Sequence, residues 1–241
     1  MIPAAASAPA IPRRTTRRVP FVALSGLMAL IALVGFWPNY YGPLVAGTLS
    51  HSLLIHIHAV VFTGWLVLFF LQAYFAATRR IQWHLSLGQI GMWYGLLLIG
   101  IGLTTGVLRS ADPQADDPFR LLYVAIADMV MFSGFFGAAI VYRRKPQLHK
   151  RMMLVAATSL LVAAVGRMEF LPPPPSGIPL RLLVWSAPVL LATAVDFGKS
   201  RTIHPVYLAG LAVFLLRAVS VPVATTGAWQ SFAQWVFGVV R

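Results

Sequence analysis

The sequence predicts an all-α fold, a polytopic membrane helical bundle of about seven transmembrane helices. Three observations lead to this prediction. Hydrophobic residues make up 59% of the chain and charged residues only 10%, and the mean hydropathy is +0.77. The apolar residues are concentrated in runs close to the ~20 residues that cross a ~30 Å hydrocarbon core. Short basic segments separate these runs, which indicates a multi-pass membrane protein rather than a soluble domain.

The chain begins with a basic segment rich in proline and alanine, residues 1–20, which we expect to be a disordered N-terminal tail. The apolar run 21–37 that follows is longer than the ~7–15 residues of a signal-peptide core, and no convincing small-x-small cleavage site comes after it. We therefore expect an uncleaved first span. The connector after it contains Trp37, Tyr40 and Tyr41, aromatic residues suited to a membrane interface.

The second span, within 51–80, is the longest apolar run that contains several histidines. Its polar residues recur at every seventh position and so form one stripe along a helix: His51, His58, Trp65, Gln72 and Arg79. His56 lies two residues from His58, about 200° around the helix. The two rings therefore cannot reach one target, and any shared site needs side chains from other helices.

Five further apolar runs predict the remaining spans, at 88–108, 121–142, 152–171, 180–195 and 205–225. The third span carries two GxxxG pairs, beginning at Gly91 and Gly102, which we interpret as surfaces for close helix packing. The seven spans form one predicted domain over 21–226. The remaining segment, 227–241, is too short to span comfortably and carries aromatic residues near one face, so we expect a short interfacial C-terminal helix.

Lys and Arg are distributed unevenly between alternate connections. One side of the membrane collects thirteen of the 19: Arg13, Arg14, Arg17, Arg18, Arg79, Arg80, Arg143, Arg144, Lys145, Lys150, Arg151, Lys199 and Arg201. The positive-inside rule therefore predicts a cytoplasmic N-terminus and an external C-terminus. The same distribution explains the net charge of +13 by topology and by attraction to anionic phospholipid heads at the inner face, without invoking nucleic acid.

Three inner loops share a pattern around a histidine. His84, His149 and His204 each open an outward-running span, with a basic residue five positions before and Gln or Thr two positions before. The pattern indicates three parallel helical hairpins that follow one extra helix. Short basic loops also converge on this composition through the positive-inside rule alone, and the sequence leaves both interpretations open.

A first candidate site is a layer of ionisable residues at similar depth in the outer half of the predicted bundle. Ionisable groups in hydrocarbon usually pair, and they often mark a site or a pathway. We expect Asp128 to contact Arg217 or Arg167, which leaves a histidine free to bind a ligand or relay a proton. A network that only holds the helices together would explain the same residues. The candidate ligand-binding residues are His56, His58, Gln72, Asp128, Arg167 and Arg217.

A second candidate site lies at the predicted inner face. There His84, His149 and His204 would converge on a metal ion, with Asp196 as fourth ligand or orienting partner. Zinc and haem are the two cofactors considered. A bis-histidine haem in the outer half is disfavoured, because every outer histidine is on one span. Phosphate binding by these basic loops, and histidines that only cap them, are further interpretations.

The residue types also exclude several kinds of chemistry. The chain has no cysteine, which rules out thiolate metal sites, cysteine-held iron–sulfur clusters and covalent c-type haem. HExxH, GxSxG, a P-loop and a strand-linked GxGxxG are all absent. No class of enzyme is therefore predicted, and enzymatic activity is left open.

Several segments carry a family resemblance: FWPNYYGPL, HIHAVVFTGWLVLFFLQAYF, WHLSLGQIGMWYG, LHKRMMLVA and HPVYLAGL. Together they resemble an uncharacterised family of bacterial multi-pass inner-membrane proteins with histidines in the second span and inner loops. The resemblance covers 37–211 and implies a bacterial plasma-membrane location, but no activity. Zinc-dependent seven-span hydrolases such as ceramidases are a less similar family, because their HxxxH pair near the last span is represented here by His204 alone.

These observations lead to an expected function. The chain is expected to be an integral membrane protein that binds a small ligand or cofactor through the intramembrane His/Asp/Arg layer. One alternative is a metal- or haem-binding protein in respiratory electron transfer or cofactor assembly. Another is a non-catalytic membrane scaffold or a transporter. The bilayer is the expected partner in each case, together with a membrane-protein partner or a second copy of the chain.

Overall fold

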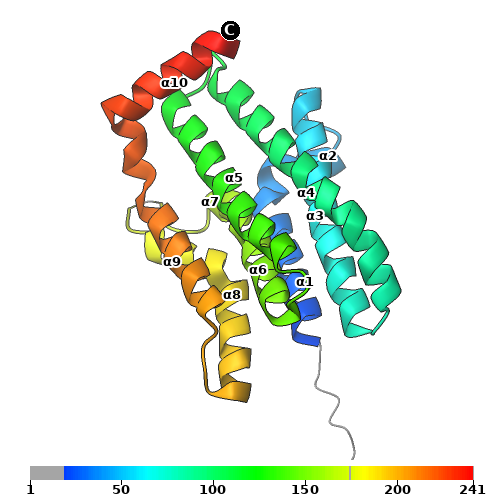
Figure 1. Cartoon of the computed structure of the whole chain (residues 1–241). Coiled ribbons are helices and arrows are strands. Elements are labelled where there is room, and N and C mark those ends of the chain that lie inside the picture. The colour runs from blue at the N-terminus through cyan, green and yellow to red at the C-terminus, as the bar shows by residue number, and fades with distance from the viewer. Residues whose placement is uncertain (1–18, 174, 241) are drawn as a thin grey trace, which may run out of the picture.

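The computed structural model describes residues 19–173 and 175–240, and within these ranges the chain is helical and contains no strand (Figure 1). The predicted all-α bundle is therefore confirmed. The expected disordered tail falls almost entirely on residues 1–18, including Arg13, Arg14, Arg17 and Arg18, which lie outside the described residues, as does Arg241.

Among the described residues, seven helical segments are long and apolar enough to cross a membrane, as the sequence predicts. They are Pro20–Val45, Leu53–Ala77, Ile81–Ser110, Pro118–Val141, Pro146–Gly166, Ile178–Ser200 and Pro205–Thr225. The chain is accordingly a multi-pass integral membrane protein. The third and fifth spans begin earlier than expected, at Ile81 instead of 88 and at Pro146 instead of 152. His84 and His149 therefore lie in the first turns of these helices.

The helices follow one another in short steps. Their bounds are α1 Val19–Phe36, η1 Trp37–Tyr41, α2 Gly42–Val45, α3 Leu53–Ala77, α4 Ile81–Ser110, α5 Pro118–Val141, α6 Pro146–Ser159, α7 Val162–Gly166, α8 Ile178–Ser200, α9 Pro205–Val219, η2 Val221–Thr225 and α10 Gly227–Val240. Proline opens α5, α6 and α9, where its fixed φ suits the first helical residue and its missing N–H costs nothing. The Asp117 carboxylate caps α5 by accepting the N–H of Arg120 at 3.1 Å.

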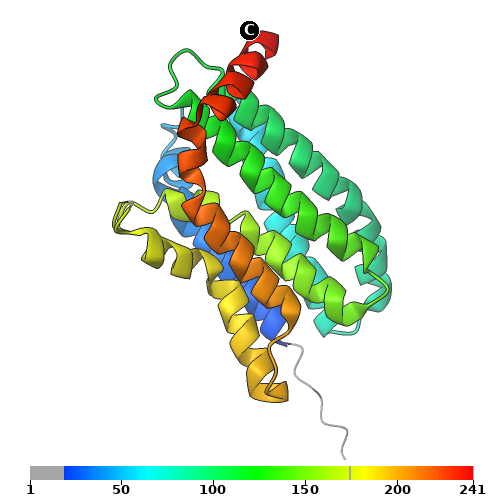
Figure 2. The ribbon, with the colours of Figure 1, turned by 60° about the vertical axis from the view of Figure 1, so that its left-hand side comes forward.

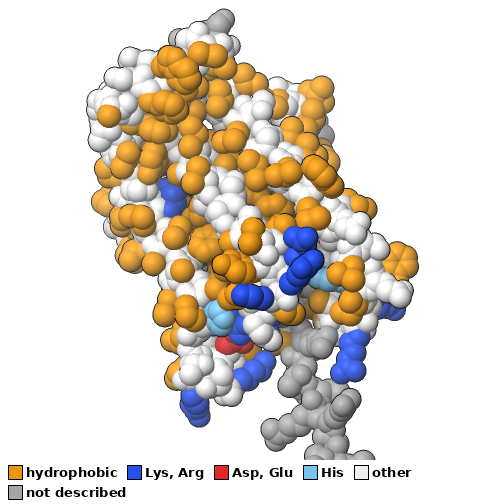
Figure 3. Space-filling view, viewed as in Figure 1, with side chains coloured by type: hydrophobic (Ala, Val, Ile, Leu, Met, Phe, Trp, Pro, Cys, Tyr) orange, Lys and Arg blue, Asp and Glu red, His pale blue; other side chains and the backbone are white. Residues whose placement is uncertain are grey.

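Neighbouring spans pack along the bundle in an order that the two ribbon views share (Figure 2). α3, α4, α5 and α6 pack in succession, while α1 packs against α3, α7 and α8, and α8 pairs with α9. The connections α3–α4, α5–α6 and α8–α9 lie at one end, which we call the basic end because Lys and Arg gather there (Figure 3). The opposite end, which carries α10, is called the α10 end.

Two large apolar cores hold the spans together in the described part of the chain, and a third, minor one lies under α10. The larger joins α1, α6, α8 and α9 through fully or nearly fully buried side chains such as Met28, Leu154, Trp185 and Phe214. The smaller joins α3, α4, α5 and α6 around Trp65, Leu98, Phe132 and Phe136.

The C-terminal helix α10 lies across the ends of α4 and α5. Ala233 and Phe237 are buried against them, and Trp229 Nε1 donates to the carbonyl of Phe119 at 2.9 Å. Trp235 and Val239 are exposed on the other side. The short C-terminal helix is therefore present, and its position in the membrane interface stays a prediction.

Three of the four glycines in the GxxxG pairs, Gly95, Gly102 and Gly106, lie where neighbouring helices approach closely, as the GxxxG interpretation predicts. A Cβ added at Gly95 would overlap the Phe136 ring, and one added at Gly106 would overlap the Ala125 side chain. Gly100, which lies outside both pairs, has no neighbouring atom within 4 Å of an added Cβ. Small residues on one face of α4 therefore let α5 pack against it.

We predict that Gly95→Ala destabilises the bundle by about 1–3 kcal/mol, because the new methyl group forces the Phe136 ring out of its packed position. The matched control is Gly100→Ala, on the same helix, where the methyl group meets open space. Thermal unfolding of the purified variants in detergent measures the difference. Equal melting temperatures for the two variants would contradict the packing role of Gly95.

Candidate functional site

A buried ion pair joins α5 to α9. Arg217 Nε donates to Asp128 Oδ1 at 2.7 Å, and the two residues are 8% and 7% exposed. The Arg217 guanidinium also lies over the Tyr123 ring, 5.9 Å from its centroid. The expected contact of Asp128 with Arg217 is thus confirmed. Since each charge has its partner inside the protein, we interpret this pair as a structural contact that links the two helices.

Arg167 lies elsewhere, just after α7. Its Nη1 donates to the carbonyl of Ala163 at 2.8 Å, and its guanidinium stacks over Phe36 at 5.0 Å. It is near enough to interact electrostatically with His58 and with Arg109. The predicted layer is therefore divided, with the Asp128–Arg217 pair in one place and Arg167 with His58 in another.

His58 and Thr105 have buried polar atoms that no other part of the described chain satisfies. His58 Nδ1 and Thr105 Oγ1 are each buried without a hydrogen-bond partner. Each lies five residues from the α10 end of its helix, His58 after Leu53 and Thr105 before Ser110, so the two lie at similar depth in the adjacent helices α3 and α4. An unsatisfied buried polar atom costs about 1–3 kcal/mol of folding free energy. A polar ligand that binds at this depth would therefore stabilise the protein.

The remaining candidates lie apart from His58. The hydroxyl of Tyr40 lies 3.1 Å from His56 Nδ1, whereas His58 stacks on Phe62 at 4.1 Å, so the two histidines face different ways as the helical geometry predicts. Gln72 is two heptads further along α3, about 21 Å away at the basic end. The six predicted ligand-binding residues therefore do not form one site.

An open groove of about 540 Å³ runs between η1, α2, α3 and α4. Its walls are apolar, and the hydroxyls of Tyr41 and Thr63, which lie on it, hydrogen-bond each other at 2.7 Å. None of the six candidates lines it. We assign no chemistry to this groove.

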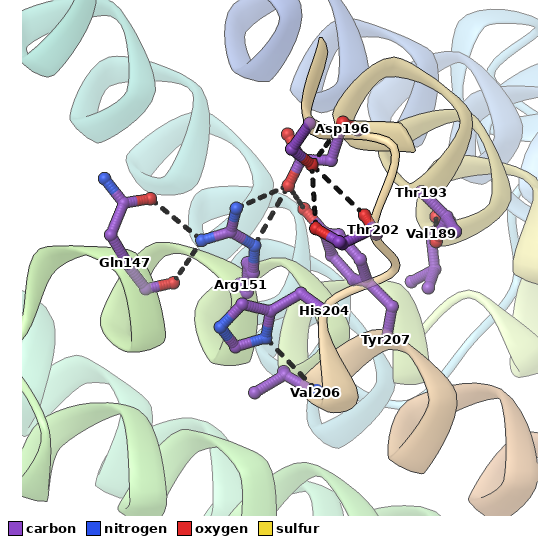
Figure 4. A network of polar contacts seen from close by, with 10 residues as sticks. Gln147, Arg151, Val189, Thr193, Asp196, Thr202, His204, Val206 and Tyr207 are labelled. Carbon is purple, nitrogen blue, oxygen red and sulfur yellow. Dashed lines mark hydrogen bonds and ion pairs between the residues drawn. The ribbon is translucent and has the colours of Figure 1, made fainter. Parts of the chain in front are cut away.

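At the basic end, Asp196 belongs to an ion-pair network rather than to a metal centre (Figure 4). Its Oδ2 accepts from Arg151 Nη2 at 2.5 Å and Nε at 3.0 Å, and from the Tyr207 hydroxyl at 3.3 Å. Arg151 Nη1 in turn donates to the backbone and side-chain oxygens of Gln147. Sequence reasoning used Arg151 only to set orientation and missed Tyr207. The sequence offered no clear signal, because Arg151 directly precedes the expected span 152–171, and only the earlier start of α6 at Pro146 places it inside the helix.

The three basic-end histidines adopt two arrangements. The Nδ1 of His84 lies 3.2 Å from the carbonyl of Gln72, and the Nδ1 of His149 lies 2.9 Å from that of Ala139. Each of these two histidines is the fourth residue of its helix and donates to a backbone carbonyl of the preceding helix. His204 instead precedes α9 and accepts the N–H of Val206 through Nδ1 at 3.3 Å. The histidine contact is thus shared by two of the three loops, and the repeat stays a prediction.

The four predicted metal ligands are not brought together. Within 19–173 and 175–240, no group of three or more histidine, aspartate or glutamate side chains is placed to hold a metal ion. The rings of His84 and His149 do meet, with centroids 6.5 Å apart, whereas His204 contacts Tyr207. A zinc centre built from all four residues is therefore not supported by their positions.

No family model, no curated protein and no solved structure matches this chain. The seven spans agree with the multi-pass architecture that the resemblance implies. A bacterial origin and membership of that family stay predictions.

We predict that Arg217→Leu destabilises the bundle by about 3–5 kcal/mol, because it leaves the Asp128 carboxyl buried without its partner. The double variant Asp128→Leu/Arg217→Leu should recover most of this loss, since an apolar pair carries no desolvation penalty. Chemical unfolding in detergent, with the exposed Arg120→Leu as control, measures both. A double variant as unstable as the single one would contradict the interpretation of the pair as a structural link between α5 and α9.

We predict that His204 makes stability depend on pH. Partial burial, and then the charge of Arg151, lower the pKa of His204, although Asp196 opposes the shift. The unfolded chain therefore takes up a proton near pH 6.5 before the folded chain does, and stability falls as the pH drops from there through the lower folded pKa. His204→Asn keeps an N-cap that does not titrate. Its melting temperature should fall less than that of the unchanged protein between pH 7.5 and pH 5.5, and equal falls would exclude His204.

Proposed function

We propose that this integral membrane protein binds a small anionic ligand at the α10 end, between α3, α4 and the segment after α7. The proposal is carried by the electrostatic proximity of Arg167 to His58 and to Arg109, with no carboxylate paired to either arginine among the described residues. Two like charges repel each other, and an anion between them would relieve that cost.

The neighbouring groups supply further donors. Thr105 lies one turn before Arg109 on α4 and has an unpartnered hydroxyl. His58, at similar depth on α3, has an unpartnered ring nitrogen. Arg167 uses one of its five N–H groups on Ala163, which leaves a fork suited to a carboxylate or phosphate. The arrangement of cations and neutral donors supports an anion more than a cation.

The ion pairs Asp128–Arg217 and Arg151–Asp196 do not take part in this proposal. Each is self-contained, so each supports helix packing, the role that a membrane scaffold would need. The basic end, with Arg79, Arg80 and Arg143, supports a cytoplasmic orientation toward anionic phospholipid heads in a bacterial inner membrane.

The test is a thermal-shift titration of the purified protein in neutral detergent with inorganic phosphate and with dicarboxylates. A ligand at 100 times its Kd stabilises by about 2.7 kcal/mol, so binding should raise the melting temperature by several degrees. Arg167→Gln should abolish the shift, and His58→Ala should weaken it. Arg120→Gln, at an exposed position of the same end, serves as control and should keep it. A shift as large in Arg167→Gln as in the unchanged protein would refute the site.

A further inference from the structure

His84 and His149 meet at the basic end from two different spans. His84 is the fourth residue of α4 and His149 the fourth residue of α6, and α5 packs against both helices. Their ring centroids lie 6.5 Å apart with the ring planes at 84°. The sequence assigned both to one inner face, but did not predict that the two rings approach each other.

Both rings are oriented as metal-binding imidazoles are. Each Nδ1 is engaged by a backbone carbonyl of the preceding helix, Gln72 for His84 and Ala139 for His149. This bond fixes the tautomer, with the proton on Nδ1, and leaves Nε2 as a lone-pair donor. Neither Nε2 has a hydrogen-bond partner within the part of the chain that the structure describes.

The separation of the rings fits one metal ion between them. Metal–imidazole bonds are about 2.0–2.1 Å long, so two rings bound through Nε2 to one ion have centroids about 6.4 Å apart. The observed 6.5 Å agrees with this value without any movement of the helices.

The number of protein ligands restricts the kind of metal centre. Zinc sites take at least three protein ligands, and no third histidine, aspartate or glutamate joins the pair in the described ranges. The bound group must therefore bring its remaining ligands with it. A porphyrin supplies four nitrogens to iron and leaves two axial positions, and without cysteine its attachment is non-covalent. We propose that His84 and His149 are the two axial ligands of a b-type haem.

The charge around the pair fits haem better than a free cation. Arg79 and Arg80 precede α4, and Arg143, Arg144 and Lys145 precede α6. These exposed side chains would repel a divalent ion, but they suit the two carboxylates that haem carries. The gathering of basic side chains at this end is visible in Figure 3.

The wall beside His84 carries a glycine and a polar group without a partner among the described residues. Gly88 lies one turn after His84, and an added Cβ there would meet only Gln72 Nε2, at 3.7 Å. The side-chain amide of Gln72 is buried, and neither its nitrogen nor its oxygen has a partner in the described chain. The same residue holds His84 through its carbonyl. A porphyrin edge along α4 would give this amide a carboxylate to bind.

The test is reconstitution of the purified full-length protein with hemin. The unchanged protein should bind one equivalent and give a six-coordinate, low-spin absorption spectrum. His84→Ala and His149→Ala should each lose the low-spin spectrum, and added imidazole should restore it by filling the vacated position. His204→Ala, at the third histidine of the same end, should keep it. Retained low-spin spectra in both single variants, or no hemin binding by the folded protein, would overturn the proposal.

Two further measurements do not depend on the folding of the variants. Ring planes near 84° predict a highly anisotropic low-spin ferric EPR signal for the unchanged holoprotein, and the ordinary rhombic signal of parallel rings would overturn the geometry. Stoichiometric zinc or copper on the unchanged protein, with no hemin binding, would overturn the assignment to haem. Arg167→Gln, which tests the anionic-ligand site, should leave the haem spectrum unchanged.

Discussion

In the hydrocarbon core of a membrane no water is available for hydrogen bonding, so a polar or charged group needs a partner within the protein. That requirement explains the two ion pairs that tie the bundle together. Asp128 and Arg217 join α5 to α9 near one end, and Arg151 and Asp196 join α6 to α8 near the other. Apolar packing holds neighbouring spans at many places without distinguishing among them. The ion pairs add direction, because only one register of each helix pair satisfies both charges.

Where the requirement is not met, the structure offers candidate sites. His58 and Thr105 at the α10 end, and Gln72 at the basic end, each bury a polar atom without a partner in the described residues. The surroundings of the two ends differ. Arg109 and Arg167 near His58 led us to propose an anion as the partner, whereas the two neighbouring imidazoles near Gln72 led us to propose a metal-containing group. The two proposals therefore rest on separate residues and concern different ends of the molecule.

The sequence was sufficient for the features that depend on position along a helix. The lengths of the apolar runs predicted the seven spans. The rotation of about 100° per helical residue predicted that His56 and His58 face different ways, and similar depth in the membrane predicted the contact of Asp128 with Arg217. Features that depend on which helices are neighbours were not accessible. Arg167 was placed in the Asp128 layer because its depth matched, but it follows α7 and stacks on Phe36 of α1. The Arg151–Asp196–Tyr207 network and the facing of His84 with His149 were missed for the same reason.

The Asp128–Arg217 pair also bears on how the protein is made. Its members are 89 residues apart, and the span that carries Asp128 is synthesised four helical segments before the one that carries Arg217. Spans leave the ribosome in chain order, so for that interval the carboxyl lacks its guanidinium. A chain that stops before α9 leaves the Asp128 carboxyl unpaired at the level of the lipid tails, with the cost that an unpartnered ionisable group carries in hydrocarbon.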